Sequence, residues 1–539
     1  MNIPVNFLTW ITAALPIIVL LILMVKFQWG AVNAAPIGVF ISIIVGILLY
    51  KADIKMIAME GAKGLWSALT VLIVVWPAIL IFEVASEAKA FTVFRSGMQK
   101  MIPNELLQVI ILSWVFVSFL QGITGFGVPV AVGAPLLVGM GMSPLWAVII
   151  TLIGHAWGNT FGTLAVAWEA LVNGAGLSSN PDLLLRSALW AAIFIWIWNL
   201  ITGFAICLFY GGKRGLKKGL PAVLIISLIQ GGGQLLLSQI NQTLACFVPA
   251  CIALVVSLFL GKTKFYGQAW RIEDSKIMVR EGTDRTSVSG NMPENMNMHQ
   301  AFLPYYALTI ITLIVLLISP IKKALGQFTI GFDFPEMSTG FGYVDVAVKK
   351  FSAIAPLTHA GTFLVVSSII GYCYFRKHRW IEKGGMRRIL KRSLEKTIPS
   401  AIAVVAFLLM SKIMGGTGQT VVLARGVANT LGKWYVLLAP IVGVLGSFMT
   451  SSNMASNVLF SEFQLTTANI LNLDPAAILG AQTAGGAIGN TICPGNIILG
   501  TTTAGILGKE GTVLRKILPI TISAAAIVGI TVLVVTVLL

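Results

Sequence analysis

The sequence predicts an all-α polytopic membrane protein with about 12–14 transmembrane segments and two internal repeats that contain broken or re-entrant helices. Hydrophobic residues make up 57% of the 539 residues and charged residues only 11%, whereas soluble domains carry about 25% charged residues. Apolar runs of roughly 20 residues, the length that crosses a bilayer, recur from end to end. One segment recurs later in the chain in a diverged form. A water-soluble enzyme on a single membrane anchor is therefore excluded.

The apolar runs define the expected spans in chain order. Neither a basic segment nor a small-residue cleavage site precedes the first run, so we expect it to be a retained span and not a signal peptide. Polar or basic connectors separate many of the runs. Their approximate limits are 7–25, 31–50, 65–85, 106–120, 144–168, 187–210, 220–239, 243–260, 302–320, 360–375, 398–413, 436–449 and 515–539.

Short basic connectors explain the formal net charge of +17. Lys and Arg gather on the cytoplasmic side of membrane proteins, so the charge requires no polyanionic partner, and nucleic acid is not expected. Pairs of spans separate the connectors at 213–218, 261–300 and 376–396, which predicts that all three are cytoplasmic. We expect 261–300 to be a solvated loop without a packed domain, and 321–358 to face outward.

The apolar runs carry no catalytic constellation. They contain no nucleophile with a base, no acid pair and no metal-ligand cluster, which argues against an enzyme. No Walker A motif follows a strand, so transport driven by ATP within this chain is not expected. The cysteines have the spacing of neither a disulfide framework nor a metal site, and we expect no cofactor; they are Cys207, Cys246, Cys251, Cys373 and Cys493.

A duplicated segment is the most informative feature. PLWAVIITLIGHAWGNT at 144–160 aligns without a gap with PAAILGAQTAGGAIGNT at 475–491. Small residues let membrane helices pack closely and make them resemble one another, but this does not explain proline, asparagine and threonine in the same register. We therefore expect two copies of one transport core, which divides the chain into N-terminal spans 1–64, repeat 65–210, connecting spans 211–397 and repeat 398–539.

Each copy contains stretches that break a helix. QGITGFGVP at 121–129 holds three glycines and a proline, and GSFMTSSNMASN at 446–457 is dense in hydroxyl and amide groups. The two Gly-Asn-Thr triplets are further breaks. Unpaired backbone at membrane depth is tolerated only inside protein or beside a water-filled cavity, so broken helices at matching positions indicate a substrate site. The alternative is a set of kinks that Ser and Thr side chains stabilise.

The expected ligand of these breaks is a small organic anion. Interrupted helices expose amide donors and the positive ends of their dipoles, which attract a carboxylate without a full positive charge. His155 shares one helix face with Thr151 and Asn159, as Gln482 does with Asn490 in the second copy. The imidazole could carry a proton or bind the carboxylate, or it could be a hydrogen-bonded structural residue.

These motifs resemble those of the lactate permease family, whose members carry L-lactate and glycolate and are described as proton symporters. FLQGITGFGVPVA at 119–131 and PLLVGMG at 135–141 resemble the family's FLEGxxGFGxPVA and LLVGLG stretch. GSFMTSSNMASNVLF at 446–460 resembles GxFxTGSxxxSNxLF, and GILGKEG at 505–511 resembles GLVGKEG. The resemblance covers most of the chain. It implies a secondary active transporter that moves a small monocarboxylate across the plasma membrane with protons.

Several positions depart from the family's pattern. Gln121 stands where the family commonly has Glu, Asn453 where many members have Asp, and Asn490 where some have Lys. His155 and Trp157 replace an Asn and a small residue or Pro. If the family couples protons through the Glu, that route is absent here, and His155 is the candidate substitute. Trp157 is a candidate for reshaping the pocket.

Sodium is the alternative coupling ion. Amide, hydroxyl and unwound carbonyl oxygens are hard ligands, and Asn159, Thr160, Asn490 and Thr491 supply them. A channel is a further alternative. The candidate substrate-binding residues come from the breaks and from the polar helix faces: Gln121, Gly122, Thr124, Gly125, Gly127, His155, Asn159, Thr160, Thr450, Ser451, Ser452, Asn453, Asn457, Gln482, Asn490 and Thr491.

Overall fold

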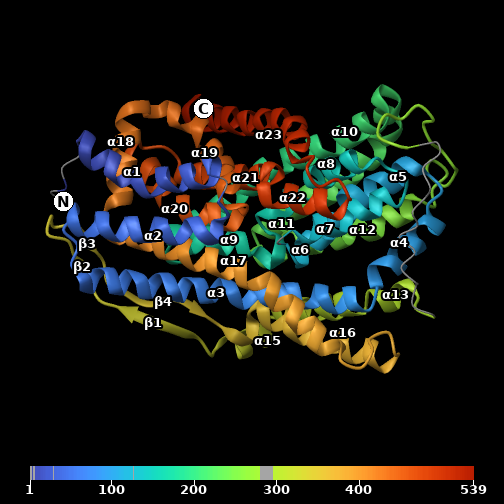
Figure 1. Ribbon diagram of the computed structural model, residues 1–539, viewed down its shortest axis with the longest axis horizontal. Helices are drawn as coiled ribbons and strands as arrows, with labels where there is room; N and C mark the ends of the chain where they lie inside the picture. The colour runs from blue at the N-terminus through green and yellow to red at the C-terminus, as the bar shows by residue number, and fades with distance from the viewer. Residues whose placement is uncertain (1–2, 4–5, 28, 126, 280–294, 539) are drawn as a thin grey trace.

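The protein is an elongated bundle of helices in the computed structural model, which describes residue 3 and residues 6–27, 29–125, 127–279 and 295–538. Most long helices run along the long axis of the molecule (Figure 1). Within the described residues, eight helices are long and apolar enough to cross a membrane, or nine if one bent helix pair counts as a span. The prediction of an all-α polytopic membrane protein is confirmed.

The N-terminal helices form a scaffold with α17 (Gly385–Gly416). They are α1 (Phe7–Leu21), α2 (Ala31–Leu48), α3 (Ile54–Glu87) and α4 (Ala90–Met101). The Asp53 side chain starts α3 by accepting a hydrogen bond from the amide of Met56 at 2.6 Å. At the other end of α3, buried Glu83 accepts from Arg392 of α17 at 2.8 Å. The contact between Glu83 and Arg392 joins the two longest scaffold helices, which pack side by side.

The first repeat contains a helical hairpin followed by an interrupted helix. Its elements are α5 (Glu105–Ile110), α6 (Phe116–Ile123), α7 (Val128–Val138), α8 (Pro144–His155), α9 (Gly162–Ala175) and α10 (Pro181–Ser227). The apolar run expected at 144–168 is broken between α8 and α9. The runs expected at 187–210 and 220–239 both start within α10, which changes direction at Gly211 and Gly212 because Gly212 adopts φ +55° and ψ −139°.

The connecting region contains helices and two small antiparallel sheets. The helices are α11 (Gly233–Ser238), α12 (Phe247–Leu260), α13 (Met298–Ala301), α14 (Leu303–Leu317), α15 (Ser319–Gly326) and α16 (Ala360–Lys377). Strand β1 (Ile330–Phe334) pairs with β4 (Val348–Ile354), and β2 (Met337–Ser338) pairs with β3 (Val344–Asp345). The loop expected at 321–358 is therefore structured, and α14 and α15 meet at 86°.

The expectation of a purely solvated loop at 261–300 is wrong for its first part. The carbonyl of Ile277 accepts a hydrogen bond from the Ser143 amide at 2.8 Å, and the carbonyl of Trp270 accepts from Glu105 at 3.0 Å. The side chains of Ile272 and Ile277 are buried. This apolar burial packs 261–279 onto α5 and onto the turn between α7 and α8. Residues 280–294 lie outside the described residues.

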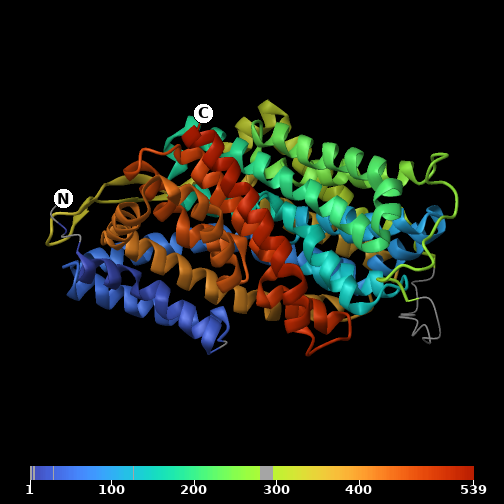
Figure 2. The same ribbon diagram turned by 90° about the horizontal axis from the view of Figure 1, so that it is seen from above.

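The second repeat has a similar element order. After α17 come α18 (Gln419–Leu431), α19 (Tyr435–Thr450), α20 (Asn453–Ile470), α21 (Pro475–Gly489), α22 (Pro494–Thr503) and α23 (Glu510–Leu533). Helices α19 and α20 form a hairpin like α6 and α7, and the α21–α22 break follows it. Figure 2 shows α23 running diagonally across the molecule, where it contacts helices of both repeats. The three predicted domain boundaries, at 64/65, 210/211 and 397/398, fall inside α3, α10 and α17, and the domain division stays a prediction.

The three basic connectors gather at one end of the molecule. The ion pair between Arg214 and Asp274, at 2.8 Å, joins the first connector to the second. The turn between α16 and α17 lies at the same end, while β2 and β3 lie at the opposite end with the N-terminus (Figure 1). The connectors therefore share one side of the bundle, as their spacing along the chain predicts.

Candidate functional site

A cavity of about 1150 Å³ lies where the broken helices of the two repeats meet. Both repeats contribute to its wall, together with α2 and α17 of the scaffold. The predicted residues that line it are Gln121, Gly127, His155, Asn159, Thr450, Ser451, Ser452, Asn453 and Asn490. The other predicted residues are not part of the lining; they are Gly122, Thr124, Gly125, Thr160, Asn457, Gln482 and Thr491.

Glycines reverse the chain at the tip of the α6–α7 hairpin. Gly125 and Gly127 have φ of +56° and +79°, a region that residues with a side chain seldom adopt. A Cβ at Gly125 would also collide with the hydroxyl of Thr163. Behind the tip, Gly122 packs against Phe247 and the Thr124 hydroxyl donates to its own helix. The reversal brings the N-terminus of α7 to the cavity.

Hydroxyl groups build the corresponding tip between α19 and α20. Ser451 takes the left-handed conformation at φ +56°, and the Ser452 side chain caps α20 by accepting from the Ala455 amide at 3.3 Å. The Ser451 hydroxyl accepts from the amide of Gly495 at 3.1 Å. This bond joins the hairpin tip to the start of α22, so both breaks of the second repeat open on the same cavity.

The first Gly-Asn-Thr break leaves an amide donor free. Asn159 lines the cavity, its side chain is buried, and its Nδ2 has no hydrogen-bond partner among the described residues. Beyond it, Thr163, Leu164 and Ala165 are left-handed at φ +50°, +52° and +70°. Each such residue costs roughly 1–2 kcal/mol relative to the right-handed form. The first break is therefore a strained turn beside an unpaired donor.

The second Gly-Asn-Thr break is closed by its own side chains. The Asn490 Oδ1 accepts hydrogen bonds from the Asn496 amide and, at 3.3 Å, from the Cys493 thiol. The Thr491 hydroxyl donates to Ile488 and pairs with Thr521 of α23 at 2.8 Å. Asn490 lines the cavity with an acceptor that is already used, while Thr491 faces α23.

Hydrogen bonds between the repeats hold the two breaks together. The hydroxyls of Thr160 and Thr483 lie 3.0 Å apart, and the Asn453 amide donates to Thr160 at 3.3 Å. The Asn457 amide donates to the Ala167 carbonyl at 2.8 Å. Gln482 takes part in a similar network within the second repeat, where its Oε1 accepts from Gln464 at 2.8 Å. Asn453 lines the cavity, and the other polar residues of these networks lie behind its wall.

His155 faces the cavity in one tautomer. Its Nδ1 lies 3.1 Å from the carbonyl oxygen of Thr151. A carbonyl only accepts, so in the neutral ring Nδ1 carries the proton and Nε2 is left as an acceptor. No carboxylate pairs with this ring among the described residues. Protonation at Nε2 would leave the bond from Nδ1 to the helix intact.

The described lining of the cavity offers helix N-termini and no cationic side chain. Neither Lys nor Arg occurs among its described lining residues, and the carboxylate of Glu510 already accepts from Thr501 at 2.7 Å and from the Gly508 amide at 3.0 Å. Three helices start in the wall: Gly127 is the N-cap of α7, and Asn453 and Pro494 are the first residues of α20 and α22. First-turn amides have no acceptor within their own helix, and they favour negative charge. The wall can hold a single carboxylate.

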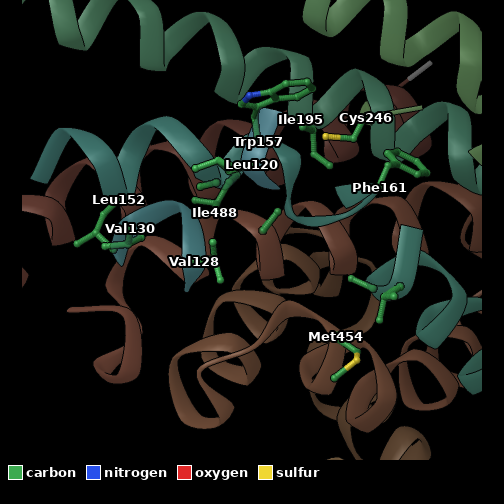
Figure 3. Packing of buried hydrophobic residues seen from close by; sticks show 14 of the residues in the cluster. Leu120, Val128, Val130, Leu152, Trp157, Phe161, Ile195, Cys246, Met454 and Ile488 are labelled. Carbon is green, nitrogen blue, oxygen red and sulfur yellow. The ribbon is translucent and has the colours of Figure 1, made fainter. Parts of the chain in front are cut away.

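Trp157 does not line the cavity. Its side chain is buried, and its Nε1 donates to the Ser118 hydroxyl at 2.5 Å. Figure 3 shows Trp157 beside Ile195 and Cys246 and away from Met454, which lines the cavity. The expectation that this ring reshapes the pocket directly is wrong, because the indole occupies the packed space behind the break.

Sequence reasoning missed part of the wall. Asn496 and Thr163 line the cavity, as do Trp29 and Phe407 from the scaffold. Asn496 lies in the CPGN stretch after the second triplet, which signalled a break but not a lining residue. The scaffold residues carry no local signal, because their place in the wall depends on how α2 and α17 pack. Of the four candidate sodium ligands, Asn159 and Asn490 reach the cavity.

Comparisons with known proteins give a family match and several relatives. The L-lactate permease family matches residues 9–539. The L-lactate permease of Halalkalibacterium halodurans is 25% identical over 94% of this chain and 93% of its own. The glycolate permease GlcA of Escherichia coli is 26% identical over 97% and 95%. Among solved structures, the YdaH transporter of Alcanivorax borkumensis aligns over 86% of this chain and 84% of its own, with 13% identity and a TM-score of 0.43.

Proposed function

Because the chain belongs to the L-lactate permease family, we propose that it is a secondary active transporter that carries a small monocarboxylate of the lactate or glycolate type across the plasma membrane together with protons. Its relatives include permeases for L-lactate and for glycolate. The observation that carries the proposal is the cavity itself, where broken helices of both repeats present uncharged donors. The basic connectors at 213–218, 261–300 and 376–396 would face the cytoplasm.

The substrate carboxylate binds at the helix N-termini in this proposal. The unpaired Nδ2 of Asn159 donates to one carboxylate oxygen, and first-turn amides of α20 near Asn453 donate to the other. Gln121 lies within reach of the same space. A site built from neutral donors binds the anion weakly enough to release it, which a carrier requires at the end of each cycle.

Proton coupling removes the electrostatic cost of moving the substrate anion across the membrane. A membrane potential of 100 mV acts on each elementary charge with about 2.3 kcal/mol, so an anion that moves alone meets this barrier and an anion with a proton does not. His155 is the proposed proton acceptor, through the Nε2 that its bond to Thr151 leaves free. A bound carboxylate favours the protonated imidazole, and by reciprocity the protonated imidazole favours the carboxylate.

Transport by the purified protein in proteoliposomes tests the function. We expect labelled L-lactate or glycolate to exchange against unlabelled substrate inside, and an imposed pH gradient, acid outside, to drive accumulation. A panel of hydroxy acids then ranks the substrates by competition. Saturation of the initial rate separates a carrier from a channel. Absence of exchange for every acid in the panel would contradict the proposal.

A second set of measurements tests the coupling ion. His155→Ala should keep exchange but lose the dependence of substrate affinity on pH, whereas His359→Ala, at the start of α16 and away from the cavity, serves as the matched control. An unchanged pH dependence in His155→Ala would exclude this imidazole. Accumulation that follows a sodium gradient at constant pH would favour the alternative, with sodium held by the oxygens of the two triplets.

A further inference from the structure

Five charged side chains come together where α3, α17 and α20 pack beneath β3, and we name them the buried charge cluster. Glu60 and Lys63 of α3 are buried and form an ion pair at 2.7 Å. Lys63 also pairs with Asp345 of β3. Glu462 of α20 interacts electrostatically with Lys412 of α17, with Asp345 and with Lys63. Ionisable side chains in this setting are costly to bury and mark functional positions in membrane proteins.

A pair of glycines makes room for two of these carboxyl groups. A Cβ at Gly415 would collide with the carboxylate of Glu462, and a Cβ at Gly416 would collide with that of Glu60. Both glycines lie at the C-terminal end of α17, which is the negative end of the helix dipole. The packing therefore brings Glu60 and Glu462 against the negative end of a helix, an arrangement that favours an added cation.

With all five side chains ionised, the cluster holds more negative than positive charge. Glu60, Asp345 and Glu462 are carboxylates, and only Lys63 and Lys412 oppose them. The pKa of Tyr343, in the turn before β3, reflects the same excess of carboxylates. Burial, and then the carboxylates of Glu462, Asp345 and Glu60, raise the pKa of the Tyr343 hydroxyl above its ordinary value. One additional proton would balance the charges of the cluster.

The position of the cluster fits an entry route to the cavity. It lies beneath β3, at the end of the molecule opposite the basic connectors (Figure 1). Helix α20 leads from Glu462 to Asn453 in the cavity wall, a distance of roughly 13–14 Å at 1.5 Å per residue. Polar Ser461 and Asn457 lie along the way, and Ser461 donates to the Asn457 carbonyl.

We propose that the buried charge cluster is the entry site of the coupling proton, with Glu462 as the group that binds it. The carboxylate of Glu462 takes up a proton from the β3 end and becomes a neutral carboxylic acid, and its O–H bond breaks again when the proton passes on toward the cavity. Lys412, Lys63, Asp345 and Glu60 set the charge that Glu462 meets. This inference rests on the proposed function, because it supplies the proton for that carrier.

Glu462→Gln provides the decisive test in proteoliposomes. The amide keeps the size of the carboxylic acid and cannot release a proton. We expect accumulation driven by a pH gradient to fall at least tenfold, while exchange of labelled against unlabelled substrate stays within twofold of the wild type. Glu395→Gln is the matched control, because Glu395 is exposed and pairs only loosely with Lys391 at 3.8 Å. It should retain both activities.

Asp345→Asn protects the test against a folding defect. Asp345 lies in the short strand β3 and its side chain is more exposed than those of Glu60 and Lys63, so its substitution should be better tolerated. It should weaken gradient-driven accumulation and spare exchange. Normal accumulation in Glu462→Gln would overturn the inference, and loss of exchange in both variants would overturn it too, because the cluster would then be structural.

A measurement without substrate separates this inference from the proposed function. If the wild type exchanges none of the acids, the carrier proposal fails, but the cluster still predicts a protonation event. The thermal midpoint of the detergent-solubilised protein should then vary with pH in the wild type and in Glu395→Gln, and vary less in Glu462→Gln. Identical pH profiles in all three proteins would overturn the proton site.

Discussion

The two Gly-Asn-Thr triplets have the same sequence and different roles. In the first, Asn159 presents an Nδ2 to the cavity that no described residue binds, and Thr160 pairs with Thr483 of the other repeat. In the second, Asn490 already accepts from Asn496, and Thr491 pairs with Thr521 of its own repeat. The matching sequence thus supplies a donor for a ligand at the first break and hydrogen bonds that stabilise the helix break at the second.

This difference shows which structural properties two copies of a sequence motif share and which they do not. The triplet places an amide and a hydroxyl at a helix break in both copies, because the register of the preceding proline is the same. The residues that follow decide what the amide does. Cys493 and Asn496 follow Asn490 and donate to its Oδ1, whereas a left-handed turn follows Asn159 and leaves its Nδ2 free. We expect substitutions at the two asparagines to affect different measurements.

The largest effect is expected for Asn159→Asp, which would put a carboxylate where the substrate carboxylate binds. Two such charges about 4 Å apart repel by about 4 kcal/mol at an effective dielectric constant of 20. We expect the KM for exchange to rise by about 100-fold to 1000-fold, since each 1.4 kcal/mol corresponds to a factor of ten. The initial rate of exchange as a function of substrate concentration measures it.

Asn159→Leu is the control for this substitution. It removes the donor without adding a charge, so the KM should rise by only about tenfold. Equal effects of Asp and Leu would mean that the side chain does not face the bound anion. If Asn490→Asp raised the KM as much as Asn159→Asp, the assignment of different roles to the two triplets would be wrong.

Asn490→Leu should show its effect in stability. Loss of the acceptor leaves the Asn496 Nδ2 buried without a partner, which costs about 1–3 kcal/mol. We expect a lower thermal midpoint in detergent and a change in KM smaller than that of Asn159→Leu. The reverse order, with Asn159→Leu less stable and Asn490→Leu weaker in binding, would show that the two roles are exchanged.

The smallest effects concern the paired threonines. Thr160→Val and Thr491→Val each remove a hydroxyl without changing shape and should each destabilise by about 0.5–1.5 kcal/mol. Only Thr160 joins the two repeats, so only Thr160→Val should also raise the KM, by about twofold to fivefold. Matched changes in KM for both variants would contradict the assignment of Thr491 to the frame of its own repeat.

The helix breaks were predictable from sequence because their causes are local. Glycines and prolines at 121–129, and the Ser-rich tip at 446–457, cannot continue a helix, and the structure interrupts α6 and α19 there. The left-handed turn was not predictable, since Thr163, Leu164 and Ala165 have no local preference for positive φ. Only the packed surroundings hold these residues in that conformation.

The buried charge cluster was missed for a different reason. Lys412 lies inside the apolar run expected at 398–413, and Glu60 and Lys63 lie just before the run at 65–85. The sequence therefore shows charged residues at these places in or beside the apolar runs. What the sequence did not reveal is that Asp345, distant along the chain, completes the group. That contact depends on the fold of 330–354. The sequence analysis did not predict the small sheets there, and this omission is the main reason that the cluster was missed.

The strained turn at the start of α9 has a practical consequence for protein engineering. Substituting glycine inside a helix usually weakens a protein, yet a left-handed residue gains from losing its side chain. Ala165, at φ +70°, is therefore a position where glycine should raise the thermal midpoint. Removal of this single methyl group is therefore a first step toward a more stable preparation for crystallisation.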